Sequence, residues 1–231
     1  MAAVMAQLSA RERLTRLVDL ANEPGVLARR ELTDQLADLL LDWPPSYPAA
    51  MREPFEALLE KALQDVEPAA RTLLTERFVR LSGMPLSVLN LLILDAVPEI
   101  RTEILSRNTN ASAQETATSR MDEALLLFAA RSATSEDLAE TLASQFRIRP
   151  EIGASILADD SAHALAILCR GAPIARATFS ALAVLARPGA AGDDHYRRLA
   201  IYDSVPAQGA RALLAFWREQ VEPGLPVVEA A

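Results

Sequence analysis

The side chains best suited to acid-base or nucleophilic chemistry near neutral pH are the two histidines, His163 and His195, and the single cysteine, Cys169. We expect His163 and Cys169 to share one helix, in which a spacing of six residues rotates them about 120° apart around the axis. They would therefore not face each other, and a nucleophilic pair would need a contact from elsewhere in the fold. The simpler interpretation is that Cys169 is a small buried apolar residue.

The densest cluster of functional groups runs from Asp193 to Arg198 and contains two carboxylates, a histidine, a tyrosine and two arginines. Such a cluster could bind an anion or a metal ion, but Asp193 and Asp194 also suit the N-terminus of a helix, where carboxylates stabilise the positive end of the dipole. We favour helix capping and solvation, and we interpret Asp159 and Asp160 in the same way. Four residues of the run remain candidates for contact with a partner: His195, Tyr196, Arg197 and Arg198.

Motifs of the standard enzyme classes are absent from the sequence. None of the eight glycines belongs to a dinucleotide-binding or P-loop motif, and the zinc-protease, nucleophile-elbow and EF-hand motifs are also missing. One cysteine cannot build a cysteine-based metal cluster. We therefore assign no catalytic, cofactor-binding or metal-binding residue, expect no cofactor, and regard enzymatic activity as the less favoured interpretation.

Two aromatic residues, Trp43 and Tyr47, flank a rigid Pro-Pro-Ser turn between predicted helices. Tryptophan and tyrosine are enriched in the hot spots of protein interfaces, so both are further candidates for contact with a partner. The alternative is that Trp43 closes the hydrophobic core at the end of its helix.

Charge and apolar content limit the classes of partner. The chain has 23 basic and 31 acidic side chains, a formal net charge of −8 at pH 7, which disfavours binding to nucleic acid or to an anionic membrane. The densest apolar stretch, residues 85–97, is interrupted by polar residues and is too short to span a bilayer. With a single cysteine and no evident signal peptide, we expect a cytoplasmic protein without a membrane-inserted segment.

The composition and the periodicity of apolar residues predict helices. Hydrophobic residues, mostly Ala and Leu, make up 51% of the chain and aromatic residues only 5%. Ser9 with Glu12, and Thr134 with Asp137, form capping-box patterns at two helix starts. Further helices are predicted over 26–42, 48–64, 151–158, 161–170, 173–187, 194–202 and 206–221. We therefore predict an all-α fold, with an apolar helix at 85–94 buried centrally between its neighbours.

A repeat with an offset of thirty residues is the most informative feature of the sequence. Residues 65–72 recur as residues 95–102, with Asp, Pro, Arg and Thr in register. In each copy the Asp is suited to cap a helix and the Pro to its first turn. A weaker third copy begins at Pro150 and has Gly153 where the arginine would stand. A fixed offset of this kind predicts stacked pairs of helices.

These Asp-x-x-Pro-x-x-Arg helix starts resemble the second-helix signature of HEAT repeats, and over residues 10–187 the chain resembles a bacterial family of uncharacterised HEAT-like proteins. The segments 65–71, 95–101, 129–131 and 138–142 carry the resemblance. It implies a HEAT-like helical-repeat array, or α-solenoid, with two packed helical blocks as a variant. In HEAT-like proteins such residues form a hydrogen-bonded ladder between repeats, which implies structural roles for Asp65, Arg71, Asp95 and Arg101.

The expected organisation has four parts. An N-terminal helical-repeat block covers 8–107, a polar connection covers 108–119, a C-terminal helical block covers 120–221, and a disordered tail covers 222–231. Because repeat stacks present extended surfaces, we favour a non-catalytic scaffold or adaptor that binds another protein. Two alternative functions stay open: a HEAT-like nucleic-acid repair enzyme, and a helical domain that senses a small ligand between the blocks. With any of these functions the chain could also form a homo-oligomer.

Overall fold

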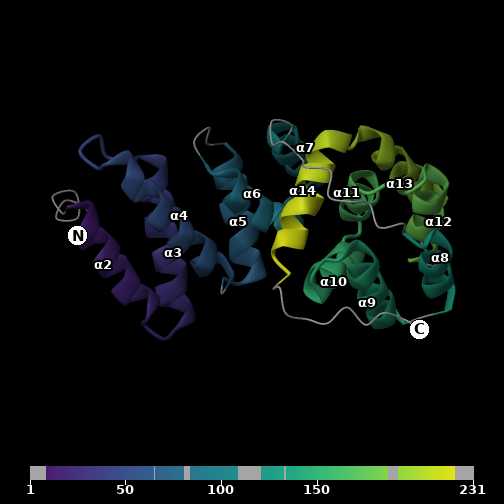
Figure 1. Cartoon of the computed structure of the whole chain (residues 1–231), viewed down its shortest axis with the longest axis horizontal. Coiled ribbons are helices and arrows are strands. Elements are labelled where there is room, and N and C mark those ends of the chain that lie inside the picture. The colour runs from purple at the N-terminus through teal and green to yellow at the C-terminus, as the bar shows by residue number, and fades with distance from the viewer. Residues whose placement is uncertain are drawn as a thin grey trace. The chain divides into compact units, whose positions relative to one another are not determined.

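The computed structural model of the chain (Figure 1) describes residues 9–64, 66–80, 84–108, 121–132, 134–186 and 192–221, the last range with side chains from Tyr196 onward. Over these ranges every regular element is a helix and no strand occurs, which confirms the predicted all-α fold. No helix in the described ranges is long and apolar enough to cross a lipid bilayer.

The chain divides into two compact units, Met1–Ile100 and Arg101–Ala231. The division falls inside helix α7 (Pro98–Arg107) and not in the polar connection predicted at 108–119. The difference arises because most of α7 packs against helices of the second unit. Apart from Asn108, the predicted connection lies outside the described residues, as does the predicted tail at 222–231.

The first unit is built from helices that pack against others close to them in sequence (Figure 1). Its elements are α2 (Ala10–Ala21), α3 (Val26–Leu41), the 3-10 helix η1 (Ala49–Met51), α4 (Arg52–Gln64), α5 (Pro68–Val79), α6 (Leu86–Leu92) and the 3-10 helix η2 (Ile93–Asp95). Helix α2 contacts α3 and α4, α3 contacts α4, and α6 contacts both α4 and α5.

The predicted helix starts are found at the expected residues. Ser9 and Glu12 form a complete capping box at α2, in which the hydroxyl accepts from the Glu12 amide and the carboxylate accepts from the Ser9 amide. Thr134 and Asp137 form the second one. Pro68 occupies the first turn of α5, where its missing amide proton removes no helical hydrogen bond.

Helix α6 is the buried centre of the first unit. Val88, Leu89 and Leu92 are fully buried, and no residue from 84 to 96 is exposed. The side chains on its remaining faces are half-buried because α4 and α5 pack on α6 from different sides. The prediction that this apolar segment lies centrally is confirmed.

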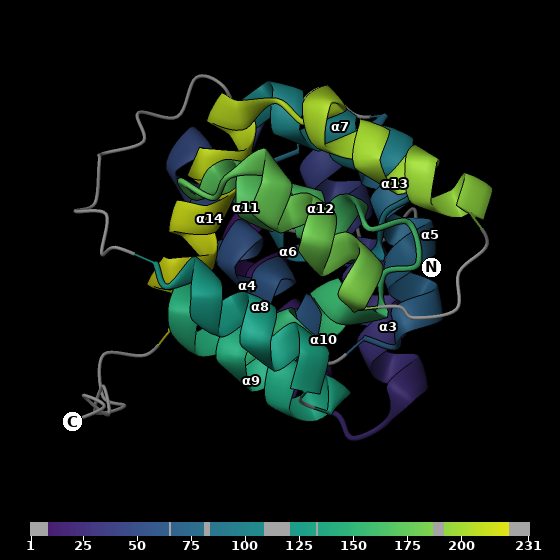
Figure 2. The same cartoon turned by 90° about the vertical axis from the view of Figure 1, so that its right-hand side faces the viewer.

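The described residues of the second unit form the rest of α7 and seven further helices, which Figure 2 shows. These are α8 (Glu123–Ser132), α9 (Ser135–Phe146), α10 (Pro150–Ala158), α11 (His163–Gly171), α12 (Arg176–Leu185), α13 (Gly192–Ser204) and α14 (Ala207–Glu219). Helix α11 is its core, since it contacts α10, α12, α13 and α14, and its residues 163–169 are all buried. Contacts between α8 and α12 and between α11 and α14 join helices far apart in the sequence.

Close helix crossings explain two glycines of the second unit. A Cβ atom at Gly153 of α10 would lie 2.6 Å from the carbonyl oxygen of Ala139 in α9. A Cβ atom at Gly209 of α14 would collide with the carbonyl oxygen of Leu105 in α7. Only glycine permits these approaches without displacing a backbone. The close approach of α10 to α9 leaves no room for a side chain at position 153. This explains why the third copy of the repeat has glycine there in place of arginine.

We expect the substitution Leu89→Ala to lower the free energy of unfolding by about 2 to 5 kcal/mol, because it removes fully buried methyl groups and leaves a cavity. Leu73→Ala is the matched control, since Leu73 is 62% exposed on α5 and its removal should change stability by less than about 0.5 kcal/mol. Urea unfolding followed by circular dichroism measures both. Equal effects of the two substitutions would show that α6 is not the core of the first unit.

Candidate functional site

The cysteine and one histidine identified from the sequence lie inside the second unit. His163 and Cys169 share α11 as predicted, and both are buried. Burial raises the pKa of the Cys169 thiol above its ordinary range, so the nucleophilic thiolate does not form near neutral pH. Cys169 is thus a small buried apolar residue, as interpreted from the sequence.

A buried ion pair joins α7 to the turn between α10 and α11. Nη1 of Arg101 donates to Oδ2 of Asp159 over 2.6 Å, and the two side chains are only 6% and 10% exposed. The Asp159 carboxylate also accepts from the backbone amide of Ala164 at 2.8 Å and from the hydroxyl of Ser161. Asp159 therefore caps the start of α11 and holds α7 at the same time. The capping expected for Asp159 is confirmed, but the expected solvation is wrong.

Ser161, His163 and Asp159 lie within a few residues of one another, yet they do not form a hydrolytic triad. The Ser161 hydroxyl donates to Asp159 and accepts from the His163 backbone amide, while Nε2 of the His163 ring lies 3.3 Å from Oγ1 of Thr102. A triad would need the ring between the hydroxyl and the carboxylate. The cluster is therefore a structural link between α7 and α11.

The ionisation of Asp159 is coupled to folding. Burial alone would raise its pKa, but the Ala164 amide and the Arg101 guanidinium together hold that pKa below the ordinary value. A carboxyl group whose pKa is lowered by folding stabilises the folded state above its ordinary pKa. The stabilisation is lost as the pH falls through the lowered value and the group becomes protonated.

The repeated arginine of the first unit also has a structural role. Arg71 lies in the first turns of α5, and its Nε donates to the Asp95 carboxylate at 2.8 Å. Its two terminal nitrogens donate to the backbone carbonyls of Leu63 and Leu91 at 2.9 and 2.8 Å. Arg71 thus ties α5 to the ends of α4 and α6. Asp65, the fourth member of the predicted ladder, lies outside the described residues.

The aromatic turn of the first unit packs inward. The Trp43 ring lies edge-on to Tyr47 and to Phe55, with ring centroids 5.6 and 5.5 Å apart. Tyr47 is only 8% exposed and Phe55 is fully buried. Tyr47 is therefore not available as a surface anchor, and the alternative in which Trp43 closes the core describes this turn better.

The run from 193 to 198 begins helix α13, and its described side chains differ in exposure. Tyr196 is 77% exposed and Arg197 is also exposed, so both remain available to a partner. The side chain of His195 lies outside the described residues. Arg198 is half-buried, and its Nη1 is shielded from solvent without a hydrogen-bond partner among the described residues.

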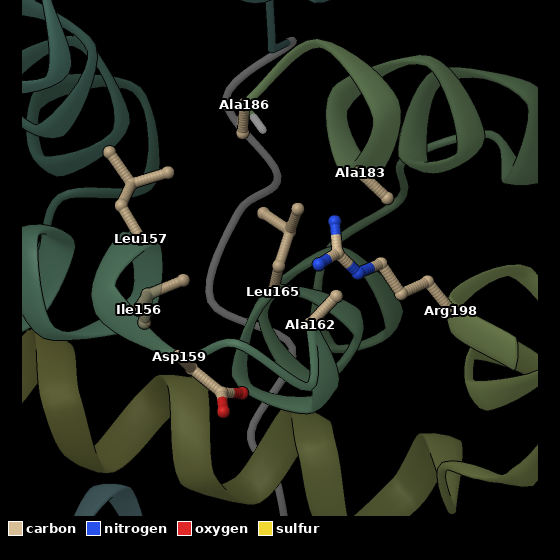
Figure 3. A pocket seen from close by; sticks show the side chains of 8 residues that line it. All are labelled: Ile156, Leu157, Asp159, Ala162, Leu165, Ala183, Ala186 and Arg198. Carbon is tan, nitrogen blue, oxygen red and sulfur yellow. The ribbon is translucent and has the colours of Figure 1, made fainter. Parts of the chain in front are cut away.

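Arg198 extends from α13 toward Leu165 in a small pocket (Figure 3). The pocket has a volume of about 10 Å³, enough for roughly one water molecule. Its other lining residues are Ile156, Leu157, Asp159, Ala162, Ala183 and Ala186. Because this volume matches a single water, we interpret the pocket as a hydration site for the guanidinium and do not assign it a larger ligand.

Leu157 and Ala186 also border a much larger groove along α9 and α10, with a volume of about 530 Å³. Leu138, Ala139, Ala154, Leu157, Ala158 and Ala186 supply its apolar lining. Ala154 and Ala158 are exposed and Leu157 is half-buried, so no described residue covers the groove side of α10. The groove is thus an open surface with a largely apolar lining.

The polar lining of the groove is acidic. Glu136 and Glu140 of α9 and Glu151 of α10 are exposed, with Ser135 and Pro150 beside them, and no basic residue lines the groove in the part of the chain that the structure describes. Nowhere in the described residues do three or more His, Cys, Asp or Glu side chains gather in a way that could hold a metal ion. The arrangement is thus suited to binding by burial and charge complementarity.

The sequence pointed to few of these residues. Histidine, cysteine and tyrosine residues are candidates for a functional site because of their chemical types, whereas the groove is lined mainly by alanine, leucine and glutamate. One signal was available: Pro150, Ala154 and Ala158 repeat at intervals of four in an apolar helix. That spacing marks one helix face, but it does not reveal that no other helix covers it.

Comparison with known proteins gives a family and no described function. A family model described as an uncharacterised protein conserved in bacteria (DUF2336) matches residues 48–215. No curated protein and no solved structure matches the chain.

We expect Asp159→Asn to lower the free energy of unfolding at pH 7 by about 3 kcal/mol, because it removes the negative charge that pairs with the buried Arg101 guanidinium. Asp95→Asn is the matched control and should cost only about 1 kcal/mol, since Asp95 is 19% exposed and Arg71 keeps two carbonyl acceptors. Between pH 6 and about pH 3, Asp159→Asn should also lose less stability than the wild-type protein. Chemical unfolding at each pH measures this, and parallel pH profiles would contradict the assigned role of Asp159.

Proposed function

The chain belongs to the bacterial family DUF2336, and we propose that it is a non-catalytic adaptor that binds a helical segment of another protein in the groove between α9 and α10. The observation that carries the proposal is the groove itself, about 530 Å³ in volume with an apolar lining and an uncovered helix face. An uncovered apolar face is costly in water unless a partner buries it for part of the time.

A helical partner fits the dimensions of the groove. Pro150, Ala154, Leu157 and Ala158 follow one another at helical spacing along the groove side of α10. From Pro150 to Ala158 the helix rises about 12 Å, or two turns. Recognition of a helix in a groove uses anchors at similar intervals, so two turns of a partner could lie along α10. The small side chains of Ala154 and Ala158 would let its backbone approach closely.

The proposed scaffold is HEAT-like in the first unit. Two features support this: the thirty-residue repetition of the Pro68 and Pro98 helix starts, and the bond from Arg71 in one copy to Asp95 in the next. In a repeat array each repeat contacts only its neighbours in the sequence. The second unit differs from this arrangement, because α8 contacts α12 and α14 contacts α11. We therefore propose a short repeat array followed by a bundle that contains the binding groove.

As part of the proposal the adaptor acts in the cytoplasm, in keeping with its single cysteine.

A second candidate function is the sensing of a small apolar ligand in the same groove. Its volume of about 530 Å³ lies in the range of typical ligand pockets, about 300 to 1,000 Å³. A thermal-shift experiment distinguishes ligand sensing from the binding of a protein partner. A metabolite that raises the melting temperature of the wild-type protein, but not of a variant with a filled groove, would favour sensing.

We expect the substitution Ala154→Trp to abolish capture of a protein partner, because the indole fills the groove at the middle of α10. Ala57→Trp is the matched control: Ala57 is also an exposed helical alanine, but it lies on α4 of the first unit. Each purified variant is used as bait in an extract of the native bacterium, and the captured proteins are identified by mass spectrometry.

The proposal predicts one protein that is recovered with the wild-type bait and with Ala57→Trp, and lost with Ala154→Trp. Circular dichroism and melting temperature establish that both variants are folded. Recovery of the same proteins with all three baits, or of none with any, would contradict a role for the groove in partner binding.

A further inference from the structure

The charges around the groove have one sign. Glu136 and Glu140 lie on α9 and Glu151 on α10, so carboxylates are contributed by both helices that form the groove. All three are exposed, and among the described residues no arginine, lysine or histidine lines the groove. An ion pair with Arg149 at 3.3 Å offsets part of the charge of Glu151, but both partners of that pair are exposed and it is weak. The groove therefore attracts cations.

The apolar lining lies between these carboxylates. Leu138 and Ala139 line the α9 side, while Ala154, Leu157 and Ala158 line the α10 side. A bound segment must bury an apolar face here while its flanks meet carboxylates on either helix. An amphipathic helix has this pattern when basic side chains border its apolar stripe.

We infer that the partner segment is a cationic amphipathic helix, whose apolar stripe lies on Ala154, Leu157 and Ala158 and whose Lys or Arg residues pair with Glu136, Glu140 and Glu151. This inference rests on the proposed function of the groove and adds the chemistry of its ligand. Long basic side chains suit such a site because their methylene stems cover apolar surface while their charged ends reach the carboxylates. Attraction between opposite charges also accelerates the encounter of the basic helix with the groove. An acidic segment is repelled, because its carboxylates would lie beside those of the groove.

A second copy of the chain fits the site less well. Each copy carries a formal net charge of −8, so two copies repel each other on average, and the acidic groove adds to that repulsion. The charge that complements this groove must therefore come from a basic segment of a different protein.

Two stapled helical peptides of about 15 residues, roughly four turns, test the inference. Both have the same Leu and Ala stripe, but one has lysine at the flanking positions and the other has glutamate. Fluorescence anisotropy measures their binding to three full-length proteins. These are the wild type, the groove variant Glu136→Gln/Glu140→Gln/Glu151→Gln, and the control variant Glu23→Gln/Glu53→Gln/Glu99→Gln, which removes three exposed carboxylates elsewhere.

The control is needed because an acidic protein binds cationic peptides weakly over its whole surface. Both variants have the same net charge, so a difference between them reports on the location of the carboxylates. We expect the lysine peptide to bind the wild type and the control variant alike, and the groove variant about tenfold more weakly at about 50 mM salt. Raising the salt to about 500 mM should reduce this difference.

The outcomes separate this inference from the proposed function. Equal binding of both peptides to the wild type, lost when the same measurement is made on Ala154→Trp, would overturn the charge preference and leave helix binding in the groove intact. Equal weakening in the groove and control variants would mean that the peptide senses only net charge, which also overturns the inference. Failure of both peptides to bind at all would contradict the groove as a helix-binding site, and with it the proposed function.

Discussion

The second unit depends on the buried ion pair between Arg101 and Asp159. Removing two charges from water carries a large desolvation penalty, which is offset only when each charge is also well hydrogen-bonded. Asp159 meets this condition through Ala164 and Ser161. The pair fixes α7 against the turn where α10 ends and α11 begins, and α11 is the helix around which the unit packs. The position of α10, and so of the groove beside it, follows from this anchor.

Most of the chemically conspicuous residues whose side chains are described are used for packing, with Tyr196 and Arg197 as exposed exceptions. Cys169 and His163 are buried in α11, Tyr47 packs with Trp43 in the first unit, and Arg71 and Arg101 hold helix ends together. The groove in which we propose that a partner binds is lined by small apolar residues bordered by glutamates. The proposed adaptor needs no reactive group, since burial and complementary charge are sufficient for selective binding. Residue type alone is therefore a poor guide to the proposed binding site.

Local features of the fold could be predicted from the sequence, and long-range features could not. The capping boxes at Ser9 and Thr134 and the burial of α6 follow from patterns contained within a few residues. The partner of Arg101 lies 58 residues away in Asp159, outside the thirty-residue register, so the repeat gave no indication of it. The division between the two units inside α7 could not be predicted for the same reason, because the contacts of α7 with the second unit are tertiary. The groove was missed because amphipathic periodicity identifies a helix face without showing whether another helix covers it.

The most direct test of this account is a double-mutant cycle on Arg101 and Asp159. The free energy of unfolding is measured for the wild type, Arg101→Met, Asp159→Asn and the double variant. If the pair is the anchor of the second unit, the double variant will be about as stable as the single variants, with a coupling energy of about 2 kcal/mol or more. Additive effects, with a coupling energy below about 0.5 kcal/mol, would show that the two residues act independently and that the pair does not organise the unit.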